Sequence, residues 1–184
     1  MSGLQIASDL EAVERDTGHE LGLGSKKSAS RKLSEYAQFE QDLRREAALM
    51  SEFYEIFYCL ENSIRRLVSD VLTDAEGADW WTSSRVDNAK IREPAERAKK
   101  KEVDHYISPR SENWIDYTSF QQLSQLITDN WDLFDAIFTS KTAVSNLTNQ
   151  LSVLRGPIAH CTLTDEIEQK RLSLMVESWF KIMS

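Results

Sequence analysis

An arginine and a histidine stand close together late in the chain, in the stretch Arg155-Gly156-Pro157-Ile158-Ala159-His160. Arginine keeps its positive charge at every physiological pH, and its planar guanidinium can donate two hydrogen bonds to one phosphate. Histidine gains and loses a proton near neutral pH, so its ring suits general acid–base catalysis. Together the two residues have the chemistry needed to handle a phosphate ester.

Helix geometry decides whether these two side chains can converge. On an unbroken helix, five residues turn a side chain by roughly 140°. Glycine followed by proline commonly ends a helix, which predicts that a helix ends at Arg155 and that His160 lies in a short crossing to the next helix, capped at Thr162. The break would let the side chains meet. A purely structural role also fits, in which Arg155 interacts with the helix dipole and His160 bonds to the backbone of the following helix.

The elements that must position this pair are expected to be helices throughout. Apolar side chains recur at helical spacing, with one stripe from Leu33 to Ala47 and a broader one from Phe53 to Val71. Ser51 either caps the second of two helices or lies within one continuous helix. Further helices are expected over residues 85–106, interrupted or restarted at Pro94, over 120–138, over the stretch ending at Arg155, and from about 163 to the end.

These patterns predict an all-α helical bundle over residues 32–184. Residues 1–31 are polar and glycine-containing, and they read as a tail or linker with a short amphipathic helix near Leu4–Val13. The pair Ser119 and Gln122 predicts a capping box at the start of the 120–138 helix. Of the adjacent Trp80 and Trp81, at least one is expected in the core and the other partly exposed, where it could stack on a base.

Composition restricts the classes of function. The net charge of −8 argues against indiscriminate nucleic-acid binding, although basic residues gather at 26–32 and at Lys99, Lys100 and Lys101. No apolar run is long enough to span a membrane, and no secretory leader is evident, so a cytoplasmic location is expected. Two cysteines and three isolated histidines give no metal-binding spacing, so neither a metal nor another cofactor is expected, and Cys161 is expected to be packed.

The order of several motifs resembles the HEPN superfamily of small helical domains that bind nucleotides and RNA. Arg155 and His160 fit its R-x4-6-H signature. They are preceded by Tyr58-x-x-Glu61-x-x-x-Arg65 and by the segments Trp80-Trp81, Tyr117-Thr118-Ser119-Phe120, Leu126-Ile127 and Asn130-Trp131. Over residues 50–184 the chain looks like prokaryotic members similar to the C-terminal domain of a eukaryotic nuclear mRNA-surveillance endoribonuclease.

The resemblance implies a metal-independent endoribonuclease of the toxin or defence type. It would act as a homodimer, hold RNA at the dimer interface, and leave a 2′,3′-cyclic phosphate, with an antitoxin protein as a further partner. Arg155 would clamp the phosphate and His160 would act as general acid or base. Glu61 and Arg65 would assist, unless they form only a solvated ion pair. By their charge, Lys99, Lys100 and Lys101 are the best candidates for RNA contact outside the motif, unless they form only a solvated helix face. Gly156 stands where many members have a polar residue, which favours the alternative of a non-catalytic module that binds a nucleotide or a partner protein.

Overall fold

The computed structural model describes residues 34–163 and 165–183. The predicted tail, its short helix and the basic residues 26–32 lie outside the described residues. The chain divides into two compact units, Met1–Arg44 and Arg45–Ser184. Within the described residues all regular elements are helical, apart from one isolated bridge between Phe138 and Met183. The predicted all-α fold is therefore confirmed.

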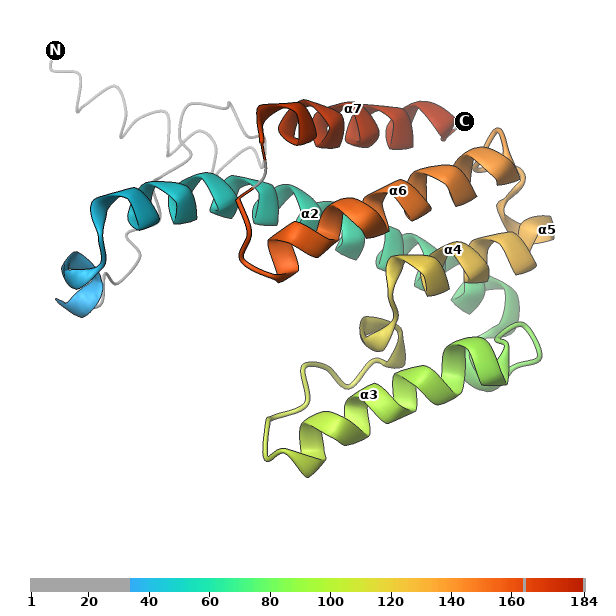
Figure 1. Ribbon diagram of the computed structural model, residues 1–184. Coiled ribbons are helices and arrows are strands. Elements are labelled where there is room, and N and C mark those ends of the chain that lie inside the picture. Colours follow the sequence, from blue (N-terminus) through green and yellow to red (C-terminus); the bar gives the residue numbers. More distant parts are fainter. Residues whose placement is uncertain (1–33, 164, 184) are drawn as a thin grey trace, which may run out of the picture. The chain divides into compact units, whose positions relative to one another are not determined.

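Six α-helices make up most of the described residues, and Figure 1 shows their course. They are α2 (Gln41–Glu76), α3 (Glu93–Asp104), α4 (Phe120–Asp129), α5 (Trp131–Phe134), α6 (Lys141–Ala159) and α7 (Glu166–Ile182). Short helical turns connect them: η1 (Ser34–Gln38), η2 (Trp80–Thr82), η3 (Asn88–Arg92) and η4 (Trp114–Tyr117).

The sequence was compatible with either one helix or two across the stripes from Leu33 to Val71. From Gln41 onwards the structure has one continuous helix there, α2. Ser51 is not an N-cap, since its hydroxyl donates to the carbonyl of Ala48 within the helix. The broader apolar stripe is buried from Phe53 onwards. The earlier stripe is not core, because Phe39 and Leu43 are exposed.

The core of the larger unit forms where α4 packs on α6 and α6 packs on α7. The apolar face of α2 joins this core, and Phe57 meets Phe120 edge to face at 6.3 Å between ring centroids. Burying such aromatic and branched side chains supplies most of the driving force for folding. The most deeply buried positions include Ile64, Leu72, Leu123, Leu126, Leu151, Leu172 and Trp179.

The α4–α5 region departs from the single helix predicted over 120–138. The predicted capping box is present, with Ser119 accepting from the Gln122 amide. The helix nevertheless stops at Asn130, whose buried side-chain amide donates to the carbonyls of Leu126 and Arg85. An asparagine that bonds backbone carbonyls in this way competes with the helix for its partners, which explains the break.

Other boundaries also move from their predicted places. Pro94 marks a restart, because the π-helical turn η3 runs directly into α3 with Pro94 in its first turn. The last helix begins at Glu166 rather than near Leu163, and its N-cap is Asp165, which accepts from the Glu168 amide. Thr162 is therefore not its cap. Both Trp80 and Trp81 are buried, at 7% exposure each, so neither is a free stacking surface.

Candidate functional site

A buried carboxylate on α2 lies at the centre of the candidate site. Glu61 is only 8% exposed, and its Oε1 accepts a hydrogen bond from Arg65, one helical turn later. Its Oε2 lies 3.4 Å from Nε of Arg155 on α6. A carboxylate this far from water requires cationic partners, and two guanidinium groups provide them. The site residues predicted separately at Glu61, Arg65 and Arg155 therefore belong to one cluster.

Arg65 fixes the inner side of this cluster. Besides Glu61, its guanidinium donates to the carbonyl of Thr118 at 2.9 Å. Thr118 immediately precedes the cap of α4, so Arg65 connects α2 to the start of α4. Its side chain is 13% exposed, which makes it a structural cation rather than a free one.

Arg155 forms the outer side of the cluster, with a side chain that is 54% exposed. Only its Nε is directed at Glu61, and its other guanidinium nitrogens make no hydrogen bond or ion pair within the described residues. A guanidinium carries five N–H donors. Arg155 is thus oriented by the protein and still able to donate to a ligand.

These side chains line one cleft of about 660 Å³, named here the Arg155 cleft. Its basic and acidic lining residues are Arg65, Arg110, Arg155, Glu61 and Asp116, which leaves one net positive charge. Two exposed tyrosines, Tyr54 and Tyr58, and the end of α6 at Ile158 and Ala159 complete it. A concave surface that combines aromatic rings with a net positive charge suits a nucleotide.

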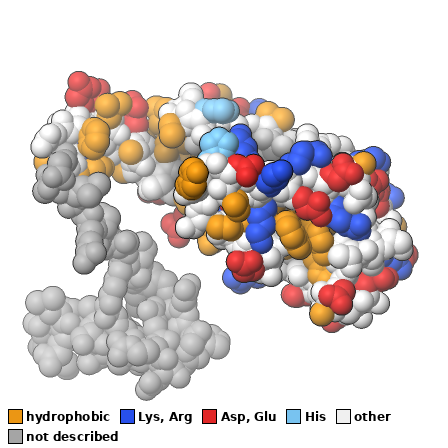
Figure 2. Space-filling view, turned by 90° about the horizontal axis from the view of Figure 1, so that it is seen from below, with side chains coloured by type: hydrophobic (Ala, Val, Ile, Leu, Met, Phe, Trp, Pro, Cys, Tyr) orange, Lys and Arg blue, Asp and Glu red, His pale blue; other side chains and the backbone are white. Residues whose placement is uncertain are grey.

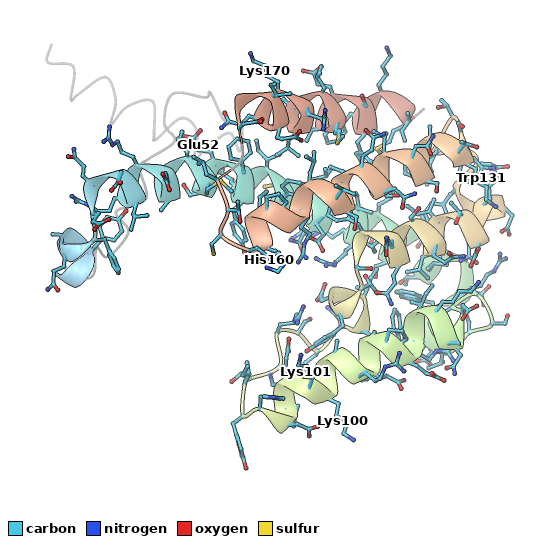
Figure 3. The ribbon with its side chains drawn as sticks, in the orientation of Figure 1. Glu52, Lys100, Lys101, Trp131, His160 and Lys170 are labelled. Carbon is cyan, nitrogen blue, oxygen red and sulfur yellow. The ribbon has the colours of Figure 1, made fainter. Side chains whose placement is uncertain are left out.

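His160 lies outside this lining, at the exposed C-terminal end of α6 (Figure 3). Its ring makes no hydrogen bond or ion pair with any described residue. The predicted backbone break between Arg155 and His160 is wrong, because α6 continues through Gly156 and Pro157 to Ala159. On this continuous helix the two positions are separated by roughly 140° around the helix axis.

The end of α6 is a Schellman motif in which a cysteine takes the position usually given to glycine. The amide of Cys161 donates to Ile158 and that of Thr162 donates to Pro157, while Cys161 has a φ of 54°. This pattern defines the last turn, with His160 as the C-cap. Cys161 is exposed rather than packed. The same motif ends α3, with His105 as C-cap and Tyr106 at a φ of 57°.

The three lysines predicted as RNA contacts lie on α3, outside the Arg155 cleft. Lys99 is held by Glu112 at 3.3 Å and lies 4.6 Å from the centroid of the Trp114 ring, so it stabilises the loop that follows α3. Lys100 and Lys101 are exposed, and in Figure 3 Lys100 points away from α6. Figure 2 shows basic and acidic side chains intermingled on the face seen from below, without a uniformly positive surface.

Two cleft residues, Arg110 and Asp116, were missed from the sequence. Arg110 follows α3 in a loop, lies 5.1 Å over the ring of Tyr117, and pairs with Glu102. Hydrogen bonds from its side chain and backbone lower the pKa of Glu102 below the usual value for glutamate. Neither residue belongs to a periodic pattern, so its charge is the one sequence feature that could have identified it as a cleft residue.

A family model described as Swt1-like HEPN matches residues 55–184. The chain belongs to the Swt1-like HEPN family. The match covers all residues that line the Arg155 cleft except Tyr54, including those on the rest of α2 and on α6. No match was found among curated proteins or among solved structures.

Among the described residues, no helix combines the length and the apolar character that crossing a membrane requires. The same residues contain no cluster of three or more histidine, cysteine or carboxylate side chains arranged to hold a metal ion.

Proposed function

We propose that this HEPN domain cleaves RNA, with the phosphate bound in the Arg155 cleft. The observation that carries the proposal is the orientation of Arg155 by the buried carboxylate of Glu61, which leaves other guanidinium donors facing a cleft with net positive charge. The exposed rings of Tyr54 and Tyr58 supply surfaces on which bases can stack.

The chemistry requires two proton transfers. A general base removes the proton of the 2′-hydroxyl, whose oxygen then bonds to phosphorus. The bond from phosphorus to the 5′-oxygen breaks, and a general acid protonates that oxygen. The products are a 2′,3′-cyclic phosphate and a 5′-hydroxyl. Histidine is suited to both transfers, and Arg155 would stabilise the charge that develops on the phosphate oxygens.

Of the two histidines among the described residues, His160 is the one near the cleft, and it does not line it. A two-fold dimer would bring a second His160 and a second Arg155 to the same interface, because such interfaces are self-complementary. We therefore place the active site between two copies, with one His160 as base and the other as acid. Glu61 and Arg65 then act by positioning Arg155.

The alternative is a non-catalytic module that binds a nucleotide or a partner protein. It is favoured by the position of His160 outside the cleft and by Gly156 in place of the polar residue common in the family. In that case the cleft would bind a nucleotide without cleaving it.

A cleavage assay on the full chain in the presence of a metal chelator separates these alternatives. RNA fragments with 2′,3′-cyclic phosphate ends are expected from the wild type, and a loss of at least a hundredfold from Arg155→Ala and His160→Ala. His105→Ala is a matched control, because His105 caps α3 with the same motif. Intact RNA with the wild-type protein would favour the binding module, whereas equal losses at both histidines would contradict the role proposed for His160.

A further inference from the structure

A groove of about 530 Å³ lies between α2 and α7 and is named here the α2–α7 groove. Leu60 on α2 is buried in it, at 3% exposure, whereas the ring of Phe180 on α7 is 60% exposed. The other apolar residues that line it are Ile56, Cys59 and Val176. None of the described residues lines both this groove and the Arg155 cleft, so the two surfaces are separate. A concave apolar surface between two helices is typical of a site that binds a partner.

The polar residues of this groove make it acidic. Glu52 and Glu55 line it together with Ser63, and the lining contains no basic side chain. Both carboxylates are exposed, and neither forms a hydrogen bond or ion pair with another described residue. They stand three positions apart on one helix, an arrangement in which like charges repel each other. A positive charge placed over the groove would therefore relieve this repulsion.

The negative charge restricts what the groove can bind. Nucleic acids and anionic lipid surfaces attract basic side chains, and this lining repels them with two carboxylates. A second copy docked through the same groove would bring two pairs of glutamates together, because a two-fold interface places a surface against itself. A basic segment of another protein has the complementary charge.

We propose that the α2–α7 groove binds an amphipathic helix of a partner protein, whose apolar stripe is flanked by lysine or arginine. Such helices insert apolar side chains that recur every three or four residues into hydrophobic grooves. The apolar stripe covers Leu60 and Phe180, and the basic side chains pair with Glu52 and Glu55. This binding does not require RNA cleavage, and it leaves the Arg155 cleft open.

Fluorescence anisotropy on the full chain tests this surface with three synthetic peptides of about 18 residues, or five turns of helix. The first peptide carries leucine every three or four residues and lysine beside each leucine. The second has glutamate in place of lysine, and the third has alanine in place of leucine. The first is expected to bind with a dissociation constant of about 1–100 μM, and the other two at least about tenfold more weakly.

Substitutions in the groove should weaken binding of the first peptide. The double variant Glu52→Lys, Glu55→Lys reverses the charge and should bind it at least about tenfold more weakly. Phe180→Ala removes the exposed ring and should weaken it about five- to thirtyfold. The controls Glu96→Lys on α3 and Leu174→Ala on α7 change exposed residues outside the lining, and they should bind as the wild type does. Circular dichroism checks that each variant is folded.

The outcomes also identify other occupants. Failure of the first peptide to bind, or wild-type affinity in both groove variants, overturns the docking surface. A dimer that becomes monomeric in Phe180→Ala, measured by sedimentation velocity, would assign the groove to a second copy and overturn the partner helix. Tighter peptide binding after Lys26→Glu and Lys27→Glu would mean that basic residues of the same chain compete for the groove, with the same consequence.

The docking surface and the proposed nuclease can fail independently. Peptide binding that the groove variants weaken, with intact RNA in the cleavage assay, keeps the docking surface and removes the nuclease. RNA cleavage by a chain that binds none of the peptides does the reverse.

Discussion

At the scale of single residues, the main feature is the sharing of one carboxylate by two arginines. Glu61 and Arg65 are four positions apart on a helix, a pair that on a surface contributes only a few tenths of a kcal/mol. Here both are largely buried, and Arg155 comes from another helix to the second carboxylate oxygen. The sequence analysis named all three residues as candidates, but their shared environment depends on how α6 packs and could not be predicted from their spacing.

Replacing this carboxylate by an amide should be costly. Glu61→Gln keeps the shape but leaves the guanidinium of Arg65 without its counter-charge, so we expect unfolding free energy to fall by about 1–3 kcal/mol. Denaturant titration of the wild type and the variant measures this change in unfolding free energy. The control Glu168→Gln removes the partner of Arg171 in a more exposed pair and should cost less than about 1 kcal/mol. Equal losses of unfolding free energy in the two variants would show that the pair of Glu61 and Arg65 contributes no more than a surface ion pair.

One glutamate outside the Glu61 cluster, Glu102, gains a pH dependence from its partner Arg110. Arg110 lowers the pKa of Glu102 through its hydrogen bonds, so the folded state favours the charged carboxylate. The stability from this pair is therefore present above the usual glutamate pKa, and it is lost as the pH falls through the lowered value. Acidification should release Arg110 from the Arg155 cleft, observed as a change in the NMR signals of Tyr117. In Glu102→Gln the signals should not change over that pH range.

At the scale of elements, the sequence predicted most helices but placed several ends wrongly. The apolar spacing from Phe53 onwards and the Ser119 capping box are local signals, and both were confirmed. The errors arose where tertiary contacts, rather than the local sequence, determine where a helix ends. Asn130 bonds to Arg85, a residue far away in sequence, and Gly156-Pro157 lies inside a helix whose solvent side tolerates the missing N–H.

Near the end of α6, glycine occupies a position inside the helix, where alanine is more stable, and cysteine occupies the left-handed position that favours glycine. Gly156 lies inside the helix, and a Cβ added there would meet nothing within 4 Å. Cys161 instead adopts the left-handed conformation that favours glycine. Gly156→Ala should therefore stabilise the fold by about 0.5–1 kcal/mol. Cys161→Gly should add about as much, since relief of the strained φ outweighs the gain in unfolded-state entropy.

Thermal and denaturant unfolding of the two single variants and the double variant checks this prediction. Both substitutions should raise the midpoint. A loss of stability in Gly156→Ala would mean that the helix ends at Arg155, as the sequence pattern alone predicted. The matched position for Cys161 is Tyr106, where Tyr106→Gly should act in the same direction.

At the scale of the whole molecule, the proposed nuclease needs two copies. Sedimentation velocity is expected to show a dimer. A mixed dimer with one wild-type chain and one His160→Ala chain, isolated with two affinity tags, would lack either the acid or the base of a shared site. Its rate should fall below about a tenth of the wild-type rate. Retention of half the activity would contradict a shared site, because it would show that each copy acts alone.

The proline inside α6 has a consequence for how His160 could move. Pro157 has no amide hydrogen, so it cannot bond back to the carbonyl of Val153, whose side chain is 75% exposed. Beyond it, the amides of His160, Cys161 and Thr162 hold the terminal turn through bonds to the carbonyls of Gly156, Ile158 and Pro157. Unwinding this turn would break all three bonds and loosen Ile158, which packs against the core, while Leu151 and Leu154 stay buried. Any movement of the imidazole towards the Arg155 cleft would therefore have to replace these contacts.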